Sequence, residues 1–240
     1  MKKWALAAAL LAAAPLAMGA TAKGRNWLTT TTVTAAGHRL GNPAAPTRLM
    51  EFVSYTCPHC GHFFKEADAA IKLTLVQPGK VSVEVRHIIR DPADYAAVIL
   101  AECGDPKKFF GNHDMIFSQQ DTWIGKLQKT TRAQQERWYA GTIPERMRAV
   151  AGDAGFYPMM ETRGYSRAQV DACFNDTKKV QALFDVSKAE ADKYNVNSTP
   201  SFVVNGKTLD GHSWDSVAAA YRDLYAELAE VTARRRAVPA

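Results

Sequence analysis

Hydrophobic positions in residues 47–90 follow two different periods. Residues 47–54 (TRLMEFVS) form a short, mostly apolar run that is typical of a buried strand, and residues 81–89 (VSVEVRHII) form another. Between them, residues 61–76 place apolar side chains at helical spacing, and Pro78-Gly79 predicts where that helix ends. The pattern therefore predicts a strand, a helix and a strand, the order of a parallel βαβ unit.

The middle of the chain has only the helical period. No strand-like run occurs from residue 91 to about residue 180, and apolar residues recur there at spacings of three and four. Asp91-Pro92 is typical of a helix start, because Asp can cap a helix and Pro fits its first turn. We predict a helical insertion over residues 91–180.

Strand patterns return near the C-terminus. A helix is predicted for residues 178–194, followed by a strand at residues 201–204. Asn205-Gly206 is a hairpin signal, and we expect a return strand at residues 207–209. A last helix is predicted from about residue 214 to residue 233.

The N-terminal part of the chain predicts an edge strand and a targeting signal. Residues 27–34 (WLTTTTVT) are rich in β-branched side chains and predict an edge strand or hairpin arm. Two lysines, an apolar run at residues 4–16 and Ala-Thr-Ala at residues 20–22 are typical of a signal peptide, which we place at residues 1–22. The alternative is an uncleaved N-terminal anchor. In a bacterium this signal predicts export to the periplasm, where disulfides persist.

The charge of the chain excludes one class of partner. The formal net charge is +6, and removing Lys2 and Lys3 with the signal peptide would leave +4, spread along the sequence. This mild and dispersed positive charge is not typical of a nucleic-acid-binding surface, and we expect no nucleic-acid partner.

Four cysteines carry the candidate chemistry, and two of them form a CxxC pair. Cys57 lies where strand residues give way to helix residues, so unpaired N–H groups at the helix start would stabilise its thiolate. Pro58 fits the first helical turn, and Cys60 lies one turn along, close enough to bridge. His59 can add a donor or positive charge. We expect Cys57 to be exposed and to attack, and Cys60 to be buried and to resolve the mixed disulfide.

Stabilising a thiolate stabilises the reduced protein, so this motif predicts an oxidising disulfide. A structural zinc site is the usual rival of a CxxC pair, but zinc needs about four ligands and the remaining cysteines, Cys103 and Cys173, are isolated. A purely structural disulfide at the motif is another alternative. We expect no metal and no cofactor.

Two further positions point to the same site. Pro200 follows Thr199 directly before a predicted strand, where it either opens the strand as an ordinary trans residue or forms a cis bond that turns the backbone of Thr199 towards a passing peptide. Glu51 lies in an otherwise apolar strand, six residues before Cys57. It is either a proton acceptor beneath Cys60 or a partly exposed glutamate paired with a cation.

The order strand, CPHC, helix, strand, helical insertion, Thr-Pro, strand, strand and helix resembles the DsbA family of bacterial periplasmic thiol–disulfide oxidoreductases, over about residues 40–233. The resemblance implies an α/β thioredoxin-like fold with a helical insertion domain. The thioredoxin-like parts would be residues 23–90 and 181–240, and the insertion residues 91–180.

The resemblance also implies roles for single residues. Cys57 would be the nucleophile, Cys60 the resolving thiol and Pro200 a cis-proline facing them, while Pro58 and Thr199 would contact the substrate. DsbA of enteric bacteria has valine before the cis-proline, whereas isomerases and several other branches have threonine, as here at position 199.

The resemblance implies partners as well. The leading hypothesis is a monomeric dithiol oxidase that donates its disulfide to exported proteins and is re-oxidised by a quinone-linked membrane oxidoreductase. The alternative is a disulfide isomerase or reductase with the same site kept reduced, and a metal-binding or holdase-like protein is a third possibility. Some branches carry an extra disulfide; Cys103 and Cys173 either form one or are two small buried residues.

Overall fold

The structure is a computed structural model that describes residues 25–237. The signal peptide expected at residues 1–22 lies outside the described residues. Within the described part, a mixed sheet of six strands is flanked by helices, which confirms the predicted α/β class. Its strands, in the spatial order β1-β2-β4-β3-β5-β6, are β1 (Thr31–Val33), β2 (His38–Gly41), β4 (Val81–His87), β3 (Thr47–Val53), β5 (Ser201–Val204) and β6 (Lys207–Thr208).

The burial of two central strands, β3 and β4, explains why their sequences are so apolar. β3 and β4 pair in parallel, with Thr47 opposite Val81 and Val53 opposite His87. Every residue of β4 is buried, as expected for a strand covered on both faces. β5 pairs antiparallel with β3 on its other side, which brings residues 201–204 beside the strand that leads to the CxxC motif.

The helices are distributed over both halves of the chain. Between β3 and β4 a continuous helical segment consists of α1 (Pro58–Phe63), η2 (Phe64–Asp68), α2 (Ala69–Ile71) and η3 (Lys72–Val76). The insertion contains α3 (Pro92–Ala101), η4 (Pro106–Lys108), α4 (Phe109–Ser118), α5 (Gln120–Leu127), α6 (Arg132–Glu136), α7 (Ile143–Ala154), α8 (Phe156–Thr162) and α9 (Arg167–Asn175). α10 (Thr177–Tyr194) precedes β5, and α11 (Trp214–Ala237) ends the described chain.

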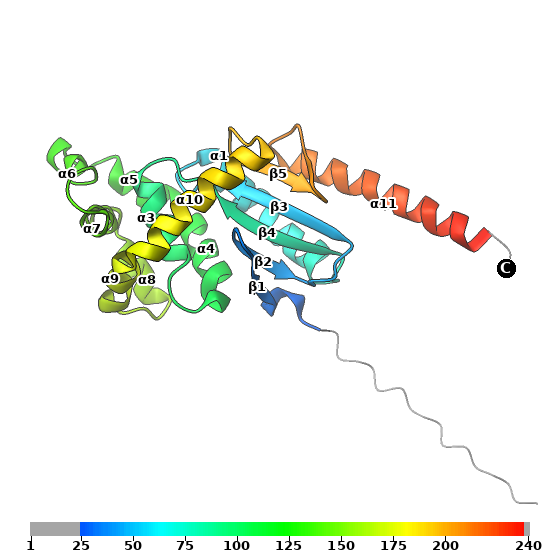
Figure 1. The fold of residues 1–240 in the computed structure, drawn as a ribbon, viewed down its shortest axis with the longest axis horizontal. Coiled ribbons are helices and arrows are strands. Elements are labelled where there is room, and N and C mark those ends of the chain that lie inside the picture. The colour runs from blue at the N-terminus through cyan, green and yellow to red at the C-terminus, as the bar shows by residue number, and fades with distance from the viewer. Residues whose placement is uncertain (1–24, 238–240) are drawn as a thin grey trace, which may run out of the picture.

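Figure 1 shows the insertion gathered on one side of the sheet, with α10 running across both parts and α11 projecting away from them. α10 is tied to each part by a hydrogen bond. The hydroxyl of Tyr95 in α3 donates to the carbonyl of Val180 (2.6 Å), and the Ser187 hydroxyl accepts the N–H of Ile89 after β4 (2.9 Å). α10 therefore fixes the insertion relative to the sheet.

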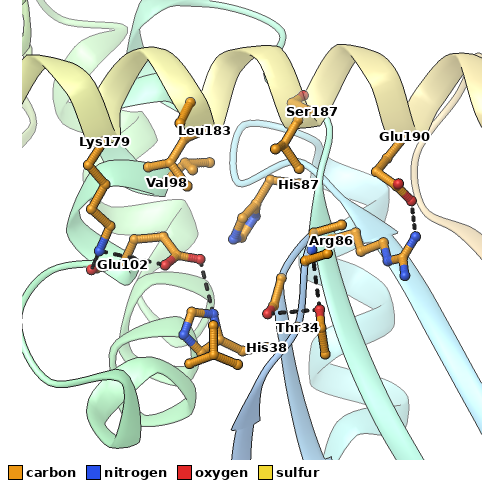
Figure 2. Close-up of a pocket in the computed structure, with 16 residues that line it drawn as sticks. Thr34, His38, Arg86, His87, Val98, Glu102, Lys179, Leu183, Ser187 and Glu190 are labelled. Carbon is orange, nitrogen blue, oxygen red and sulfur yellow. Dashed lines mark hydrogen bonds and ion pairs between the residues drawn. The ribbon is translucent and has the colours of Figure 1, made fainter.

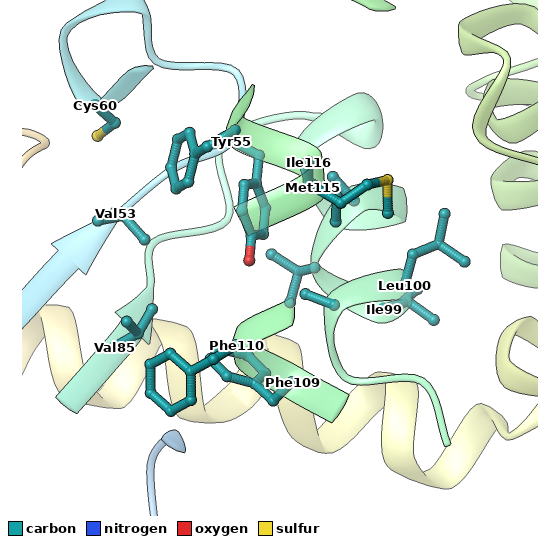
Figure 3. Close-up of a cluster of buried hydrophobic side chains, with 14 of the residues drawn as sticks. Val53, Tyr55, Cys60, Val85, Ile99, Leu100, Phe109, Phe110, Met115 and Ile116 are labelled. Carbon is teal, nitrogen blue, oxygen red and sulfur yellow. The ribbon is translucent and has the colours of Figure 1, made fainter. Parts of the chain in front are cut away.

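One hydrophobic core spans the two parts. Figure 3 shows Tyr55, from the loop after β3, among side chains of the insertion that include Phe109 and Ile116, with Cys60 at the edge of the same cluster. Tyr55 is fully buried. The loop that carries the CxxC motif is thus packed directly against the insertion. No helix in the described part of the chain is long and apolar enough to cross a membrane.

The edge strand predicted for residues 27–34 is wrong in its first half. Residues Trp27–Thr29 form a 3₁₀ turn, η1, because the Asn26 side chain accepts the N–H of Leu28 (3.1 Å) and caps the turn. Only Thr31–Val33 pairs in the sheet. β-Branched composition favoured a strand, but a local side-chain cap competes with it.

A disulfide bond joins Cys103, just after α3, to Cys173 in α9, across 70 positions of sequence. It connects the first helix of the insertion to its last. Because it closes a long loop, it restricts the unfolded chain strongly.

Replacing both cysteines (Cys103→Ala with Cys173→Ala) should therefore lower the free energy of unfolding by about 2–5 kcal/mol. Thermal unfolding followed by circular dichroism measures the effect. The matched control replaces Cys57 and Cys60 with alanine, which leaves this cross-link intact. An unchanged melting temperature in the Cys103/Cys173 variant would contradict the proposed contribution of the bond.

Candidate active site

The CxxC motif lies at the start of α1. Cys57 has an extended backbone (φ −79°, ψ 118°) and occupies the position before the helix, and Pro58 fills the first helical position. The N–H of Cys57 donates to the carbonyl of Ser54 (3.2 Å), which turns the chain between β3 and α1. The sulfur of Cys57 therefore lies at the open N-terminal end of the helix, as the sequence predicts.

The Thr199–Pro200 segment lies directly against this sulfur. The bond between the two residues is cis, and the Cys57 thiol donates to the carbonyl of Thr199 at 3.1 Å. The expectation that Cys57 is exposed is wrong, because its residue is only 2% exposed. The loop before β5 covers it, and β5 pairing with β3 holds that loop in place.

Hydrogen bonds to the Cys57 sulfur lower the pKa of its thiol from the ordinary 9.0 to about 5. The largest contribution is a hydrogen bond from the Cys60 thiol, and burial opposes it. The backbone N–H groups of Cys60 and His59, at the helix start, add further donors. These donors outweigh the Thr199 carbonyl, which favours the protonated thiol.

His59 adds an N–H donor to the Cys57 sulfur, the first of the two contributions expected from the sequence. Its side chain is exposed, and its contribution to the sulfur comes from the backbone N–H at the helix start. His59 and Pro58 both line the hollow of about 450 Å³ into which Cys57 opens, together with Asn197, Ser198 and Thr199. Both side chains are thus placed where a substrate would lie.

Cys60 is the buried partner of the pair. Its residue is 1% exposed, and burial raises the pKa of its thiol far above the ordinary value. Neither motif cysteine is in a disulfide here. At neutral pH the arrangement therefore holds one anionic sulfur, on Cys57, and one protonated sulfur beneath it that can donate a hydrogen bond.

Glu51 is buried in β3, and burial is the largest cause that raises its pKa to about 8. Its nearest charged neighbours are Asp68 and Lys72 of the helical segment that follows α1. A small cavity that Glu51 shares with Asp68, Lys72 and His113 lies against it. Among the described residues no hydrogen bond joins Glu51 to Cys60, so its role as a proton acceptor stays a prediction.

Asp94, which the sequence did not single out, holds the active-site loop from the insertion side. Its carboxylate accepts the N–H of Tyr55 (2.8 Å), the hydroxyl of Ser54 (2.7 Å) and the N–H of Arg90 (3.1 Å). Burial raises the pKa of Asp94 to about 7, and these hydrogen bonds oppose that rise. A buried carboxylate near the start of a helix gives no local sequence signal beyond its polarity.

Gln120, at the start of α5, clamps the loop from a second direction. Its side-chain NH₂ group donates to the carbonyls of Tyr55 and Cys57, both at 2.8 Å. A Cβ atom on Gly61 would lie 1.8 Å from the Gln120 side-chain oxygen, so only glycine fits directly after the motif. No sequence pattern connects position 120 to the motif.

Tyr55 and His113 complete the support beneath the loop. The Tyr55 hydroxyl lies 2.9 Å from Nδ1 of His113, and both residues are buried. Burial is the largest cause that lowers the pKa of His113 well below its ordinary value, so the ring is neutral and can accept this hydrogen bond. No sequence pattern had indicated a role for His113.

A separate cavity of about 210 Å³ lies between α10 and the end of β4 (Figure 2). His87 faces it, and burial lowers the pKa of that ring to about 4, so His87 is neutral. Its neighbours include His38, which lies 3.1 Å from the Glu102 carboxylate. None of the predicted site residues lines this cavity.

Comparisons with known proteins give the family. The model of the family described as Thioredoxin matches residues 33–221. The chain belongs to the thioredoxin family. A solved thioredoxin-fold structure, the protein-disulfide isomerase from Novosphingobium aromaticivorans, is 42% identical, with a TM-score of 0.76 over 79% of this chain and 98% of that one.

More distant similarities agree with the thioredoxin family. Wolbachia pipientis alpha-DsbA1 shares the fold at 19% identity, with a TM-score of 0.62 over 79% of this chain and 90% of that one. The predicted thioredoxin-like fold is thereby confirmed. A Rickettsia typhi protein whose name contains the words protein-disulfide oxidoreductase is 28% identical over 182 residues, 75% of this chain and 59% of that protein. The chain thus spans about three fifths of the curated relatives that it matches.

We expect the absorbance of the Cys57 thiolate at 240 nm to titrate with a midpoint near pH 5. Cys60→Ala removes the largest stabilising hydrogen bond and should raise that midpoint by at least one unit. Cys60→Ser keeps a hydroxyl donor at the same place and should raise it less. Equal midpoints for the wild type and Cys60→Ala would show that the Cys60 thiol does not stabilise the anion.

Gln120→Glu should weaken the active-site loop, because a carboxylate cannot donate to the carbonyls of Tyr55 and Cys57. We expect a loss of about 1–3 kcal/mol of stability, the cost of leaving buried carbonyls unpaired, and a higher thiolate midpoint. Gln119→Glu adds the same charge one residue earlier without breaking either hydrogen bond and is the matched control. Identical stabilities and midpoints in the two variants would contradict a positioning role for Gln120.

Proposed function

We propose that this protein is a thiol–disulfide oxidoreductase that donates a Cys57–Cys60 disulfide to the thiols of exported proteins. The observation that carries the proposal is the inequality of the two sulfurs. Hydrogen bonds lower the pKa of Cys57 to about 5, while burial raises that of Cys60. Such a pair has one good leaving thiolate, Cys57, and one thiol that stays protonated until it must react.

The exchange proceeds in two steps that balance. A substrate thiolate attacks Sγ of Cys57 in the disulfide form, the Cys57–Cys60 bond breaks, and Cys60 leaves with the electron pair and takes up a proton. A second substrate thiolate then attacks the substrate sulfur of the mixed disulfide, and Cys57 leaves as a thiolate. The substrate gains one disulfide, and the protein gains two electrons.

The direction of exchange follows from the same inequality. Every donor that stabilises the Cys57 thiolate stabilises the reduced protein and makes its disulfide a stronger oxidant. The donors at Cys57 come from Cys60 and the helix start, so they are built into the fold. This favours the role of dithiol oxidase.

A second role has support of its own. The relative at 42% identity is called a protein-disulfide isomerase. Thr199 also stands before the cis-proline, as in isomerases. An isomerase would use the same Cys57 thiolate to attack wrong disulfides, with the site kept reduced.

The setting of the reaction is also part of the proposal. We infer that the protein works as a monomer in the periplasm. There it would act on exported proteins with free thiols and be re-oxidised by a quinone-linked membrane oxidoreductase. The motif supports this setting, because a strongly oxidising disulfide is useful only where thiols are not kept reduced.

Equilibration with glutathione buffers, followed by alkylation of free thiols, measures the reduction potential of the pair. An oxidase should give a potential above about −180 mV, on the DsbA side of protein disulfide isomerase. A value near about −270 mV, typical of thioredoxin, would exclude the oxidase. Recovery of activity from a scrambled, fully oxidised test protein measures isomerase activity separately, with Cys57→Ala as the inactive control.

A further inference from the structure

A groove beside the active site is formed where α3, α7 and α10 meet. It encloses about 350 Å³ and opens on the surface next to the end of β4. Its walls combine apolar, aromatic and charged side chains, among them Arg90, Asp91, Tyr95, Tyr139, Arg146 and Phe184. None of these residues takes part in the disulfide exchange described above.

This groove borders the hollow that holds the reactive sulfur. Arg90 lines both of them. The N–H of Arg90 donates to Asp94, and the same carboxylate holds the N–H of Tyr55 in the active-site loop. The backbone of Arg90 is therefore held relative to the active-site loop, at the border between the hollow and the groove.

The groove exposes aromatic side chains. Tyr139 is 67% exposed and Phe184 is 43% exposed, although both are large and mostly apolar. The ring of Phe184 lies 5.8 Å from that of Tyr95, which lines the floor of the groove. Exposed aromatic surface of this kind gains free energy when another aromatic side chain covers it.

The charge of the groove selects an acidic partner. Among the described residues, no group forms an ion pair or hydrogen bond with the Arg90 guanidinium. The carboxylate of Asp91 also lines the groove; both its oxygens accept from neutral donors, the Thr56 hydroxyl (2.7 Å) and the N–H of Asp94 (2.8 Å), and it offsets only one of the positive charges in the groove. Arg146 adds a second positive charge, and its Nε donates to the carbonyl of Trp138 (2.9 Å).

We propose that this groove binds the residues of a substrate polypeptide next to its reacting cysteine, and that it selects an acidic residue followed by an aromatic one. The carboxylate pairs with Arg90, at the junction with the active site, and the aromatic ring packs on Phe184 and Tyr139. The proposal rests on the proposed function, since it places the substrate cysteine at Cys57. It adds a preference among substrates that the cysteine pair alone cannot supply.

Two reduced peptides test the preference. Both carry the same cysteine pair; one has Asp next to the first cysteine and Phe directly beyond it on the same side, and the other has Ser and Ala at those two positions. Stopped-flow measurement of their oxidation by the disulfide form gives two second-order rate constants. We expect the Asp–Phe peptide to react about tenfold faster, the ratio that about 1.4 kcal/mol of extra binding produces.

Variants of the groove should change this ratio. Phe184→Ala should reduce it to about twofold, and Arg90→Glu should reverse the charge preference, so that a Lys–Phe peptide reacts faster than the Asp–Phe peptide. Leu73→Ala removes another exposed apolar side chain, 64% exposed and outside the groove, and should keep the wild-type ratio. Comparing peptides on one variant cancels any change in the reactivity of Cys57 itself.

The outcomes separate the two proposals. Equal rate constants for the two peptides with the wild type, or a ratio that neither Phe184→Ala nor Arg90→Glu changes, would overturn the groove proposal and leave the oxidoreductase intact. Equal rates are also the result expected if the groove binds a regenerating membrane protein. A wild type that oxidises neither peptide nor dithiothreitol would overturn both proposals.

Discussion

The chemistry of this protein depends on keeping a negative charge on a sulfur atom that is almost completely covered. An isolated anion at such a place is costly, and burial alone would keep the Cys57 thiol protonated. The cost is offset by donors converging on one atom: the Cys60 thiol and the N–H groups at the start of α1. The low pKa of Cys57 is therefore a property of the assembled fold.

The helical insertion takes part in this assembly. Asp94 and Gln120 both belong to it, and together they hold four polar groups of the loop between β3 and α1. The loop would otherwise have to bury its carbonyls and N–H groups without partners, which folded proteins avoid. The insertion therefore acts as the scaffold on which the helix start and the cysteines are oriented, and also supplies one wall of the groove beside them.

The sequence was sufficient to predict those parts of the fold and the site that depend on residues close together in the chain. The βαβ unit, the helical insertion and the place of Cys57 at a helix start all follow from periods and residue types within short windows. The sequence did not predict the parts of the site where residues far apart in the chain make contact. Gln120 lies 63 residues from Cys57, and the burial of Cys57 depends on a segment 142 residues away. At residues 27–29 the β-branched composition was outweighed by one capping side chain, Asn26.

The contact between Gly61 and Gln120 makes these two positions interdependent in evolution. Any side chain at position 61 would occupy the space of the Gln120 amide, so a mutation there is tolerated only in a sequence where residue 120 has already become smaller. That earlier change would leave two loop carbonyls in need of another donor. Substitutions at the two positions are therefore coupled, and the change at position 120 has to come before the change at position 61.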